Sequence, residues 1–214
     1  MQKKYTHVIW DWNGTLLDDV ALCMKSINAM LKKRGLPVLG SVEAYRGAFG
    51  FPVIDYYRRV GFDFQKEPFE KLAAEYIELY HDEKNGASLF PHARAILAAF
   101  RDSGVRQIVL SASKLQNLIS QIEPFGIGSF FDETLGIADI YATGKIELGK
   151  AYIQRTRPKR AVLIGDTIHD KETADALCAD CILVACGHQS KETLLACGAP
   201  VVDRLSDIKN LLKF

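Results

Sequence analysis

The sequence predicts an α/β fold, a doubly wound parallel sheet with helices on both faces, carrying a helical insertion after its first strand. From residue 91 onward, short apolar strand patterns alternate with helical patterns, as in consecutive βα units. Residues 5–10 form a further strand pattern, but a long helical and loop region separates it from that alternation. No apolar run approaches the ~18 to 20 residues that span a bilayer, so a membrane fold is not expected.

The first elements are justified in chain order. Residues 5–10 are a β-branched and aromatic run that ends at a polar, glycine-containing segment, as a buried strand entering a loop would. Apolar residues then recur at helical spacing from Val20, and basic residues precede Gly35, which predicts a helix. After a stretch rich in glycine and proline, a second helical face follows, with Phe69, Leu72, Ala73, Tyr76, Leu79 and Tyr80.

The remaining elements alternate regularly along the chain. Strands are expected at 107–110, 134–137, 161–164 and 181–184, with residues 200–202 as a last extended segment. Helices are expected before Gly104, from Lys114, from Lys145, from Asp170 and after the strand at 181–184. Residues 1–18 and 87–214 are therefore predicted to form the α/β core domain. Residues 19–86 are predicted to form a separate helical domain without a strand.

Length, charge and cysteine content exclude several classes of protein. The 214 residues suit one domain with an insertion. The 27 basic and 26 acidic residues give a net charge of +1, so we expect no nucleic acid and no membrane as partners. Five cysteines fit a reducing compartment better than a disulfide framework, and the first residues lack a signal-peptide pattern. We therefore expect a cytoplasmic protein.

Polar residues follow three of the predicted strands. Asp11 ends the first strand, Ser111 the strand at 107–110, and Asp166 follows the strand at 161–164, with Asp170 four residues later. Ligands of parallel sheets bind at the carboxyl ends of the strands, so these groups should share one rim. Converging carboxylates repel one another unless a cation joins them, and oxygen ligands suit Mg²⁺, which often also holds a phosphate oxygen. Asp11 could then attack a phosphoryl group, and Lys145 could reach its oxygens.

These residues resemble the four ordered motifs of the haloacid dehalogenase-like (HAD) superfamily. The matching positions are residues 11–15 (DWNGT), Ser111, Lys145 and residues 165–170 (GDTIHD). The insertion at 19–86 is similar to the C1-type helical cap of that family, and the most similar branch is that of the phosphoglycolate phosphatase-like enzymes. The resemblance covers nearly the whole chain. It implies a HAD-like Rossmannoid core and a phosphatase of small phosphorylated metabolites.

The resemblance also implies a role for each site residue. Asp11 is the expected nucleophile and a Mg²⁺ ligand, and it forms an aspartyl-phosphate that water then hydrolyses. Ser111 and Lys145 are expected to bind the substrate phosphate. Asp166 is expected to ligate the metal, with Asp170 assisting.

Two further positions complete the expected site. The family's metal contact two residues after the nucleophile uses a backbone carbonyl, which Asn13 retains. Lys150 lies on the same predicted helix as Lys145 and is an alternative phosphate ligand. Lys145 is preferred because it stands at the helix start, at the longer separation from Asp166 that the family usually shows.

Asn13 departs from the phosphatase pattern. HAD phosphatases place there a second aspartate that protonates the leaving alcohol and then activates water, whereas an amide has no proton to transfer at neutral pH. General acid–base assistance contributes about 10² to 10⁴-fold. The protein could therefore favour good leaving groups, use another group such as His169, or act mainly in binding. Deamidation of the pair formed with Gly14 could also regenerate an aspartate.

Two alternatives to a phosphatase follow from Asn13. One is a catalytically impaired HAD fold that senses a phosphorylated ligand or binds a partner. The other is cleavage of a carbon–halogen or carbon–phosphorus bond, the latter requiring a Schiff-base lysine such as Lys66, Lys71 or Lys84. The insertion also carries candidate substrate-selecting residues, which are Tyr45, Arg46, Phe49 and Phe51. The substrate, the pocket-lining residues and the oligomeric state are not determined by the sequence.

Overall fold

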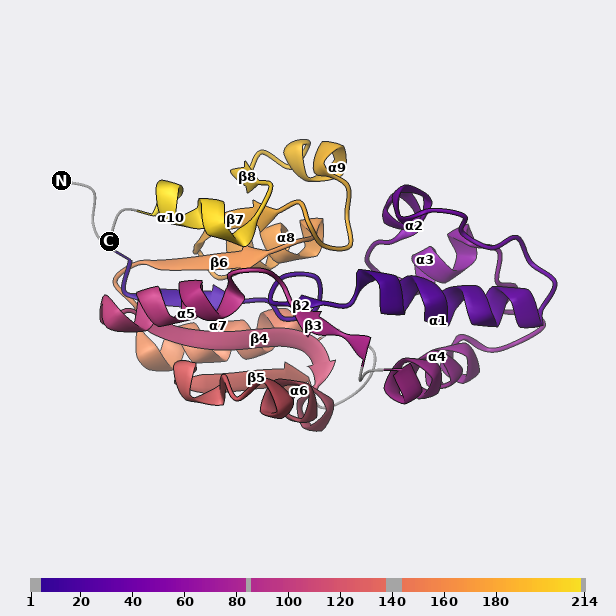
Figure 1. The fold of residues 1–214 in the computed structure, drawn as a ribbon, viewed down its shortest axis with the longest axis horizontal. Coiled ribbons are helices and arrows are strands. Elements are labelled where there is room, and N and C mark those ends of the chain that lie inside the picture. The colour runs from indigo at the N-terminus through magenta and orange to yellow at the C-terminus, as the bar shows by residue number, and fades with distance from the viewer. Residues whose placement is uncertain (1–4, 84–85, 138–143, 213–214) are drawn as a thin grey trace.

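The computed structural model describes residues 5–83, 86–137 and 144–212. Its main feature is a six-stranded sheet in the order β5-β4-β1-β6-β7-β8, in which every neighbouring pair is parallel (Figure 1). The strands are β1 (His7–Trp10), β4 (Arg106–Lys114), β5 (Glu133–Ile137), β6 (Ala161–Gly165), β7 (Asp180–Val184) and β8 (Val201–Val202). Strand order reverses on either side of β1, so the predicted doubly wound α/β fold is confirmed.

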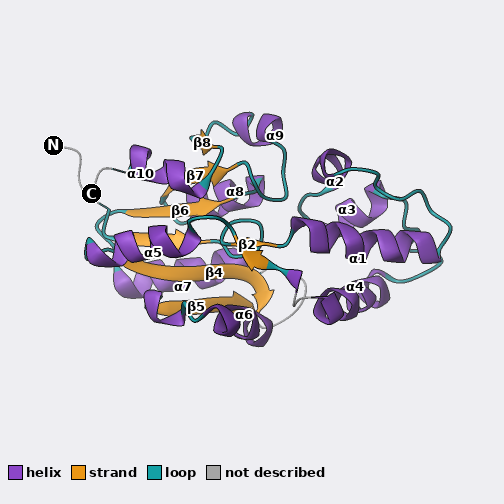
Figure 2. Ribbon diagram, viewed as in Figure 1, coloured by secondary structure: helices purple, strands orange, loops and turns teal. Residues whose placement is uncertain are grey.

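Helices cover both faces of this sheet (Figure 2). They are α5 (Ala93–Asp102), α6 (Leu115–Ile122), α7 (Lys145–Thr156), α8 (Ile168–Ala176), α9 (Lys191–Leu195) and α10 (Ile208–Leu211), with short 3-10 turns η2 (Glu123–Phe125), η3 (Gly128–Phe130) and η4 (Leu205–Asp207). Because successive strand residues point to opposite faces, Val8 and Trp10 pack on the side of α5 and α10, whereas Ile9 packs on the side of α7 and α8. The core therefore has two apolar layers.

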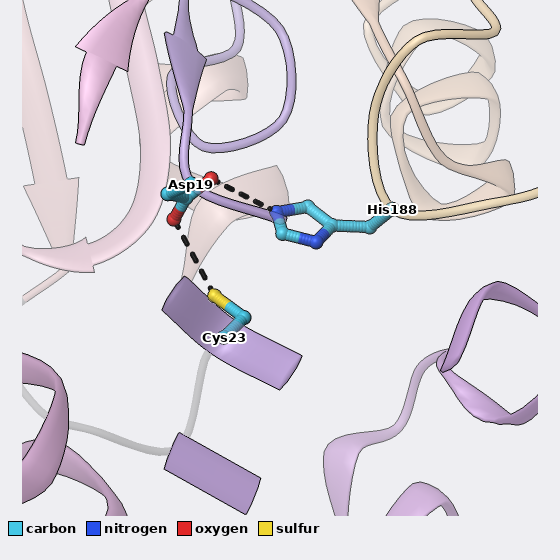
Figure 3. Close-up of side chains that lie close together, drawn as sticks. All are labelled: Asp19, Cys23 and His188. Atoms are coloured by element: carbon cyan, nitrogen blue, oxygen red, sulfur yellow. Dashed lines mark hydrogen bonds and ion pairs between the residues drawn. The ribbon is translucent and has the colours of Figure 1, made fainter. Parts of the chain in front are cut away.

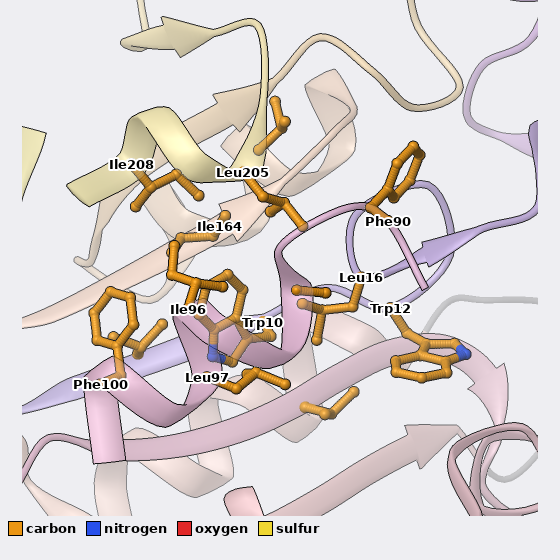
Figure 4. Packing of buried hydrophobic residues seen from close by; sticks show 14 of the residues in the cluster. Trp10, Trp12, Leu16, Phe90, Ile96, Leu97, Phe100, Ile164, Leu205 and Ile208 are labelled. Carbon is orange, nitrogen blue, oxygen red and sulfur yellow. The ribbon is translucent and has the colours of Figure 1, made fainter. Parts of the chain in front are cut away.

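The indole of Trp10 lies in the layer under α5 (Figure 4). Trp10 is fully buried and meets Phe100 edge to face, with ring centroids 5.5 Å apart. Its indole nitrogen donates to Gln107, so the ring is buried without an unsatisfied donor. This packing anchors the end of β1, directly before Asp11.

Four helices lie beyond the carboxyl ends of the sheet strands (Figure 1). They are α1 (Val20–Lys33), α2 (Val42–Ala48), α3 (Val53–Arg59) and α4 (Phe69–Glu83), and they share their own apolar cluster. The described residues between 19 and 86 contain no strand, as expected. The sequence did not predict α2 and α3, which are only two turns long; Ser41 caps α2 by accepting from the Ala44 amide.

A two-stranded antiparallel sheet connects the helical region to the core. It pairs β2 (Leu17–Asp18) with β3 (Ser88–Leu89), where the chain leaves the core and where it returns. Two-residue strands have too little periodicity to be recognised from sequence. The pairing fixes the position of Asp19, which follows β2 and precedes α1.

One strand boundary differs from the prediction in a way that concerns the site. The strand expected at 107–110 continues to Lys114, so Ser111 lies within β4 and does not follow it. The pairing of β4 with β5 shifts register between Ser111 and Lys114. Such an irregularity bends a strand and redirects its side chains, which an apolar run alone does not reveal.

Two further expectations concern the molecule as a whole. Within the described ranges, we find no helix with the length and apolar character needed to cross a membrane. Each of the five cysteines is unpaired.

Candidate active site

Three aspartates from different parts of the sequence converge at the carboxyl end of the sheet. Asp11 follows β1, and Asp166 follows the neighbouring strand β6, so the pairing of these strands brings the two residues together. Asp170 lies in the first turn of α8, where its carboxylate accepts from the amide of Thr167 and completes a capping box. Carboxylate oxygens of all three lie within 4.8 Å of one another and all three residues are buried.

Lys145 lies between two of these carboxylates. Its Nζ is 2.6 Å from Asp11 Oδ1 and 2.6 Å from Asp170 Oδ1, and the side chain is buried at the start of α7. Lys150, the alternative considered above, is partly exposed and pairs with Glu147 on the surface of the same helix. The structure thus brings Lys145, and not Lys150, to the carboxylates.

The aspartate cluster is short of positive charge. Burial and the neighbouring carboxylates raise the pKa of Asp11 to about 8, against the opposing effect of Lys145. Burial also raises the pKa of Asp166 to about 6, although the nearby His188 opposes it. For Asp170, Lys145 and its hydrogen bonds outweigh the effect of burial and lower the pKa. One lysine does not balance three buried carboxylates, so an all-oxygen donor set that fits a hard divalent cation is present here.

Asp166 is held by close backbone packing. Its Oδ2 accepts from the His188 amide at 2.6 Å, and its Oδ1 accepts from the Thr15 hydroxyl at 3.1 Å. A Cβ on Gly14 would lie 2.2 Å from Asp166 Oδ2, and one on Gly187 would lie 2.1 Å from it. Only glycine is accommodated at these two positions, which explains the glycine of the first motif in physical terms.

The aspartates open onto a cavity of about 220 Å³ between the carboxyl end of the sheet and the helices α1, α3 and α4. Ser111 lines it, buried in β4, and its Oγ accepts from the Ser113 amide at 3.0 Å. Asp11, Asn13, Lys145, Asp166 and Asp170 line the same cavity. All six residues that the sequence placed in the site therefore meet in one place.

The Asn13 side chain is fully engaged. Its Nδ2 donates to Asp19 Oδ2 at 2.8 Å and to the Tyr80 hydroxyl at 3.1 Å, and its Oδ1 accepts from Ser113 Oγ at 3.0 Å. Tyr80 in turn donates to Asp19 at 2.9 Å. Asn13 therefore links the core to α4 through hydrogen bonds. HAD phosphatases have their second aspartate at this position.

Asp19, Cys23 and His188 form a buried group beside Asn13 (Figure 3). His188 Nε2 lies 3.2 Å from Asp19 Oδ1, and the Cys23 thiol donates to Asp19 Oδ2 at 3.5 Å. Although burial opposes it, the Asp19 carboxylate raises the pKa of His188 to about 9. The effect of His188 and the hydrogen bonds likewise outweigh burial and lower the pKa of Asp19. The pair is therefore an imidazolium and a carboxylate at neutral pH.

Sequence reasoning missed Asp19 and His188. The one available signal is the double acid at 18–19, directly before the helix predicted from Val20, but acids at that place are also typical of an ordinary helix start. His188 lies in the loop between β7 and α9, and nothing in its local sequence connects it to residue 19. The two residues lie far apart in the sequence, so only folding brings them into contact.

Hydrogen bonds attach helix α2 to the loop that carries His188. The Arg46 guanidinium donates to the carbonyls of Gly187 at 2.8 Å and Cys186 at 2.7 Å. The Tyr45 hydroxyl lies 2.9 Å from His188 Nδ1. The sequence offered Arg46 as a candidate substrate-selecting residue; in this structure its guanidinium donates to backbone carbonyls.

The structure also places the other sequence candidates: His169, Phe49 and Phe51 line the same cavity. His169 lies within α8 and not in a loop, stacks on Phe51 at 4.5 Å, and has its pKa lowered by burial. Lys66 and Lys71 are exposed and pair with acids of the helical region. Lys84 lies outside the described residues.

Comparisons with known proteins identify the family of the chain. The family model described as haloacid dehalogenase-like hydrolase matches residues 8–184. The chain belongs to this family. It is 25% identical over 224 residues to a phosphoglycolate phosphatase of Nitrosococcus oceani, covering 99% of this chain and 98% of that protein. It is 27% identical over 213 residues to the tyrosine-protein kinase PtkA of Mycobacterium tuberculosis, covering 95% of this chain and 70% of the kinase.

Solved structures share the whole fold. A haloacid dehalogenase-like family hydrolase from Streptococcus pneumoniae superimposes with a TM-score of 0.84 at 19% identity, covering 98% of this chain and 99% of that one. The structure of PtkA superimposes with a TM-score of 0.82 at 23% identity, covering 99% of this chain and 100% of that one. These structures therefore share both the helical region and the α/β core of this chain.

Proposed function

We propose that this HAD hydrolase is a Mg²⁺-dependent phosphatase of small phosphorylated metabolites that works through an aspartyl-phosphate on Asp11. The observation that carries the proposal is the buried group of Asp11, Asp166 and Asp170 with Lys145 between two of them, beside Ser111 in one cavity. The named relatives include a phosphatase and a kinase, both of which transfer phosphoryl groups. Residues 19–86 would form the cap over this site.

Asp11 is suited to attack phosphorus. One of its oxygens forms a bond to the phosphorus as the bond to the leaving oxygen breaks, which yields an acyl phosphate and the released alcohol or phenol anion. Water then attacks the phosphorus of the acyl phosphate and restores Asp11 with release of inorganic phosphate. Lys145 at 2.6 Å orients the attacking carboxylate, and Ser111 is placed to donate to a phosphoryl oxygen.

Asp11, Asp166 and the backbone carbonyl of Asn13 would hold the Mg²⁺, with Asp170 assisting. When bound, the ion supplies charge that lets an anionic carboxylate approach an anionic phosphate. The fit is electrostatic, because three buried carboxylates share one lysine and the pKa of Asp11 lies near 8 without further positive charge. A hard divalent cation favours the ionised forms of all three carboxylates.

The test is hydrolysis of an aryl phosphate with and without Mg²⁺ by the native protein and by Asp11→Asn. We expect metal-dependent turnover that is abolished in Asp11→Asn. Binding is read separately as the Mg²⁺-induced rise in melting temperature, which Asp166→Asn should remove. Asp175→Asn, on the exposed side of α8, is the matched control and should keep the rise. Metal-independent turnover that survives Asp11→Asn would refute the mechanism.

A second candidate function rests on Asn13, which carries no transferable proton and is held by three hydrogen bonds. A sensor of phosphorylated ligands would bind but not hydrolyse them. Absence of turnover of any ester, together with a phosphate-induced rise in melting temperature, would support this function. Recovery of turnover in a variant that restores an aspartate at position 13 would then identify the missing acid as the cause.

A further inference from the structure

The cavity beyond the aspartates is predominantly aromatic and aliphatic. One face of α4 contributes Phe69, Ala73, Tyr76, Ile77 and Tyr80, which recur at helical spacing. Helix α3 and the loop before it contribute Phe49, Phe51, Val53 and Tyr57. A site of this kind binds an apolar group and leaves the phosphate end to the aspartates and Ser111.

The cavity has little to offer a second anion. Among the described residues that line it, the cationic side chains are Lys114, Lys145 and the His188 imidazolium, and His81 and His169 line it as well. Lys145 is already paired with Asp11 and Asp170, and His188 with Asp19; Lys114 is exposed at the end of β4. A substrate whose organic part is a carboxylate, such as phosphoglycolate, would place that charge among aromatic side chains, which is costly without a partner.

The leaving group receives no proton from position 13. Both donor hydrogens of the Asn13 amide are taken by Asp19 and Tyr80, and an amide is no acid in any case. The nearby His188 has both ring nitrogens engaged, with Asp19 and with Tyr45. A leaving group that departs as a stable anion avoids the need for an acid. A phenol has a pKa of about 10, against about 16 for water-like hydroxyls, so phenolate leaves far more readily.

We infer that the substrate is a phosphate monoester of an aromatic hydroxyl compound. The inference rests on the proposed phosphatase function and adds the substrate class. The ring would pack against Tyr76 and Phe51 while the phosphate meets Asp11 and Ser111. The volume of the cavity also fits an aromatic ring. A cavity of about 150 Å³ holds a benzene ring, and this cavity has about 220 Å³.

The test compares four phosphates in the presence of Mg²⁺. Phenyl phosphate has the ring and the good leaving group, and cyclohexyl phosphate has a similar size with a poor leaving group. Acetyl phosphate has a good leaving group without a ring, and phosphoglycolate has a charged organic part. We expect kcat for phenyl phosphate to exceed that for cyclohexyl phosphate by about 100-fold. This is the rate enhancement that a general acid would give to the poor leaving group and that Asn13 does not supply. We expect KM to be at least about 10-fold higher for acetyl phosphate and phosphoglycolate than for phenyl phosphate.

A pair of variants on one helix tests the cavity. Ala73→Leu fills it from α4, whereas Ala74→Leu adds the same volume on the exposed side of that helix. Ala73→Leu should lower kcat/KM for phenyl phosphate by about 10-fold or more, and by less for acetyl phosphate. Ala74→Leu should match the native protein. Melting temperatures of both variants show that the fold is intact.

The outcomes separate the inference from the proposed function. Equal or better turnover of cyclohexyl phosphate or phosphoglycolate would overturn the aromatic substrate class and leave the phosphatase standing. So would an Ala73→Leu variant that turns over phenyl phosphate like the native protein. Absence of turnover of all four phosphates, acetyl phosphate included, would overturn the phosphatase function and the substrate class with it.

Discussion

Asn13 Nδ2 donates to Asp19 Oδ2 at 2.8 Å. HAD phosphatases have a carboxylate at position 13; in this chain the carboxylate lies six residues later and accepts the hydrogen bond from Asn13. Asp19 accepts from Asn13, from the Gly14 amide and from Tyr80, and it pairs with His188. The amide at position 13 is thus matched to its neighbour. Two carboxylates in these places would repel each other in a buried setting.

We predict that Asn13→Asp destabilises the fold and that Asp19→Asn in the same chain relieves the part of the loss that comes from repulsion between the two carboxylates. In this variant a carboxylate faces the Asp19 carboxylate in place of the Asn13 amide donor. The loss of the hydrogen bond should lower the unfolding free energy by about 2 kcal/mol at neutral pH. The pKa of one carboxyl is then raised in the folded state, so the loss should grow as pH rises. Denaturant unfolding of Asn13→Asp, Asp19→Asn and the double variant measures this. A single Asn13→Asp variant as stable as the native protein in mild alkali would contradict it.

The same double variant should gain activity on alkyl phosphates. It carries a carboxylate at position 13 with a neutral neighbour, so that group can exchange a proton with the leaving oxygen. We expect a gain in kcat of up to about 100-fold on cyclohexyl phosphate over the native protein. The gain on phenyl phosphate should be small, because phenolate needs no proton. Equal gains on both esters would show that position 13 does not act on the leaving group.

The His188–Asp19 pair predicts how stability depends on pH. Because the pKa of His188 is raised to about 9 in the folded state, its contribution is complete below the ordinary value of about 6.5 and is lost as pH rises through about 9. That contribution is on the order of 3 kcal/mol. His188→Gln should be less stable in mild acid and should lack this part of the alkaline decline. His92→Asn, at an exposed position, is the control and should keep the native pH profile.

We predict that Lys145→Met removes activity and lowers stability, whereas Lys150→Met does neither. Loss of Lys145 leaves Asp11 and Asp170 without their buried partner, which should cost about 3 to 5 kcal/mol. The cost should increase with pH, because the pKa values of the two carboxyls rise in the variant. Kinetics and thermal unfolding over a pH series measure both effects. A Lys145→Met variant with native kcat would exclude this lysine from the site.

Arg46→Ala should loosen the loop that carries His188. The guanidinium donates to the carbonyls of Gly187 and Cys186, so its removal should cost about 2 kcal/mol. The His188 amide, which donates to Asp166, should exchange its hydrogen faster in the variant. Arg58→Ala, at an exposed pair with Asp55, should leave that amide unchanged. Unaltered exchange in Arg46→Ala would show that α2 does not hold the loop.

Deamidation of Asn13 should be confined to the unfolded chain. The reaction requires the Gly14 nitrogen to attack the Asn13 side chain, but this amide donates to Leu17 O at 2.9 Å and to Asp19 Oδ1 at 3.0 Å. We therefore expect peptide mass analysis to find intact Asn13 in folded protein and conversion after prolonged incubation in denaturant. An active preparation in which the folded protein is extensively deamidated would revive the idea of a regenerated aspartate.

Much of the architecture was determined by local patterns in the sequence. Strand and helix alternation predicted the parallel sheet, and the acids after the strands predicted the edge where they meet, because parallel strands present their carboxyl ends together. The short helices α2 and α3 and the β2–β3 pair were missed, since seven or two residues carry too little periodicity. Ser111 was expected after its strand and lies inside it, because a register shift is set by the neighbouring strand.

The composition of the site divides in the same way. The sequence by itself determined that Asp11, Asp166 and Asp170 share a rim and that the residue at position 13 is an amide. Only the tertiary structure decided that Lys145 lies between Asp11 and Asp170, and that Asn13 donates to Asp19, which pairs with His188. The reason is physical: strand ends and helix starts follow from short-range periodicity, whereas the partner of a buried polar group is chosen by whichever segment the folded chain brings within hydrogen-bond distance.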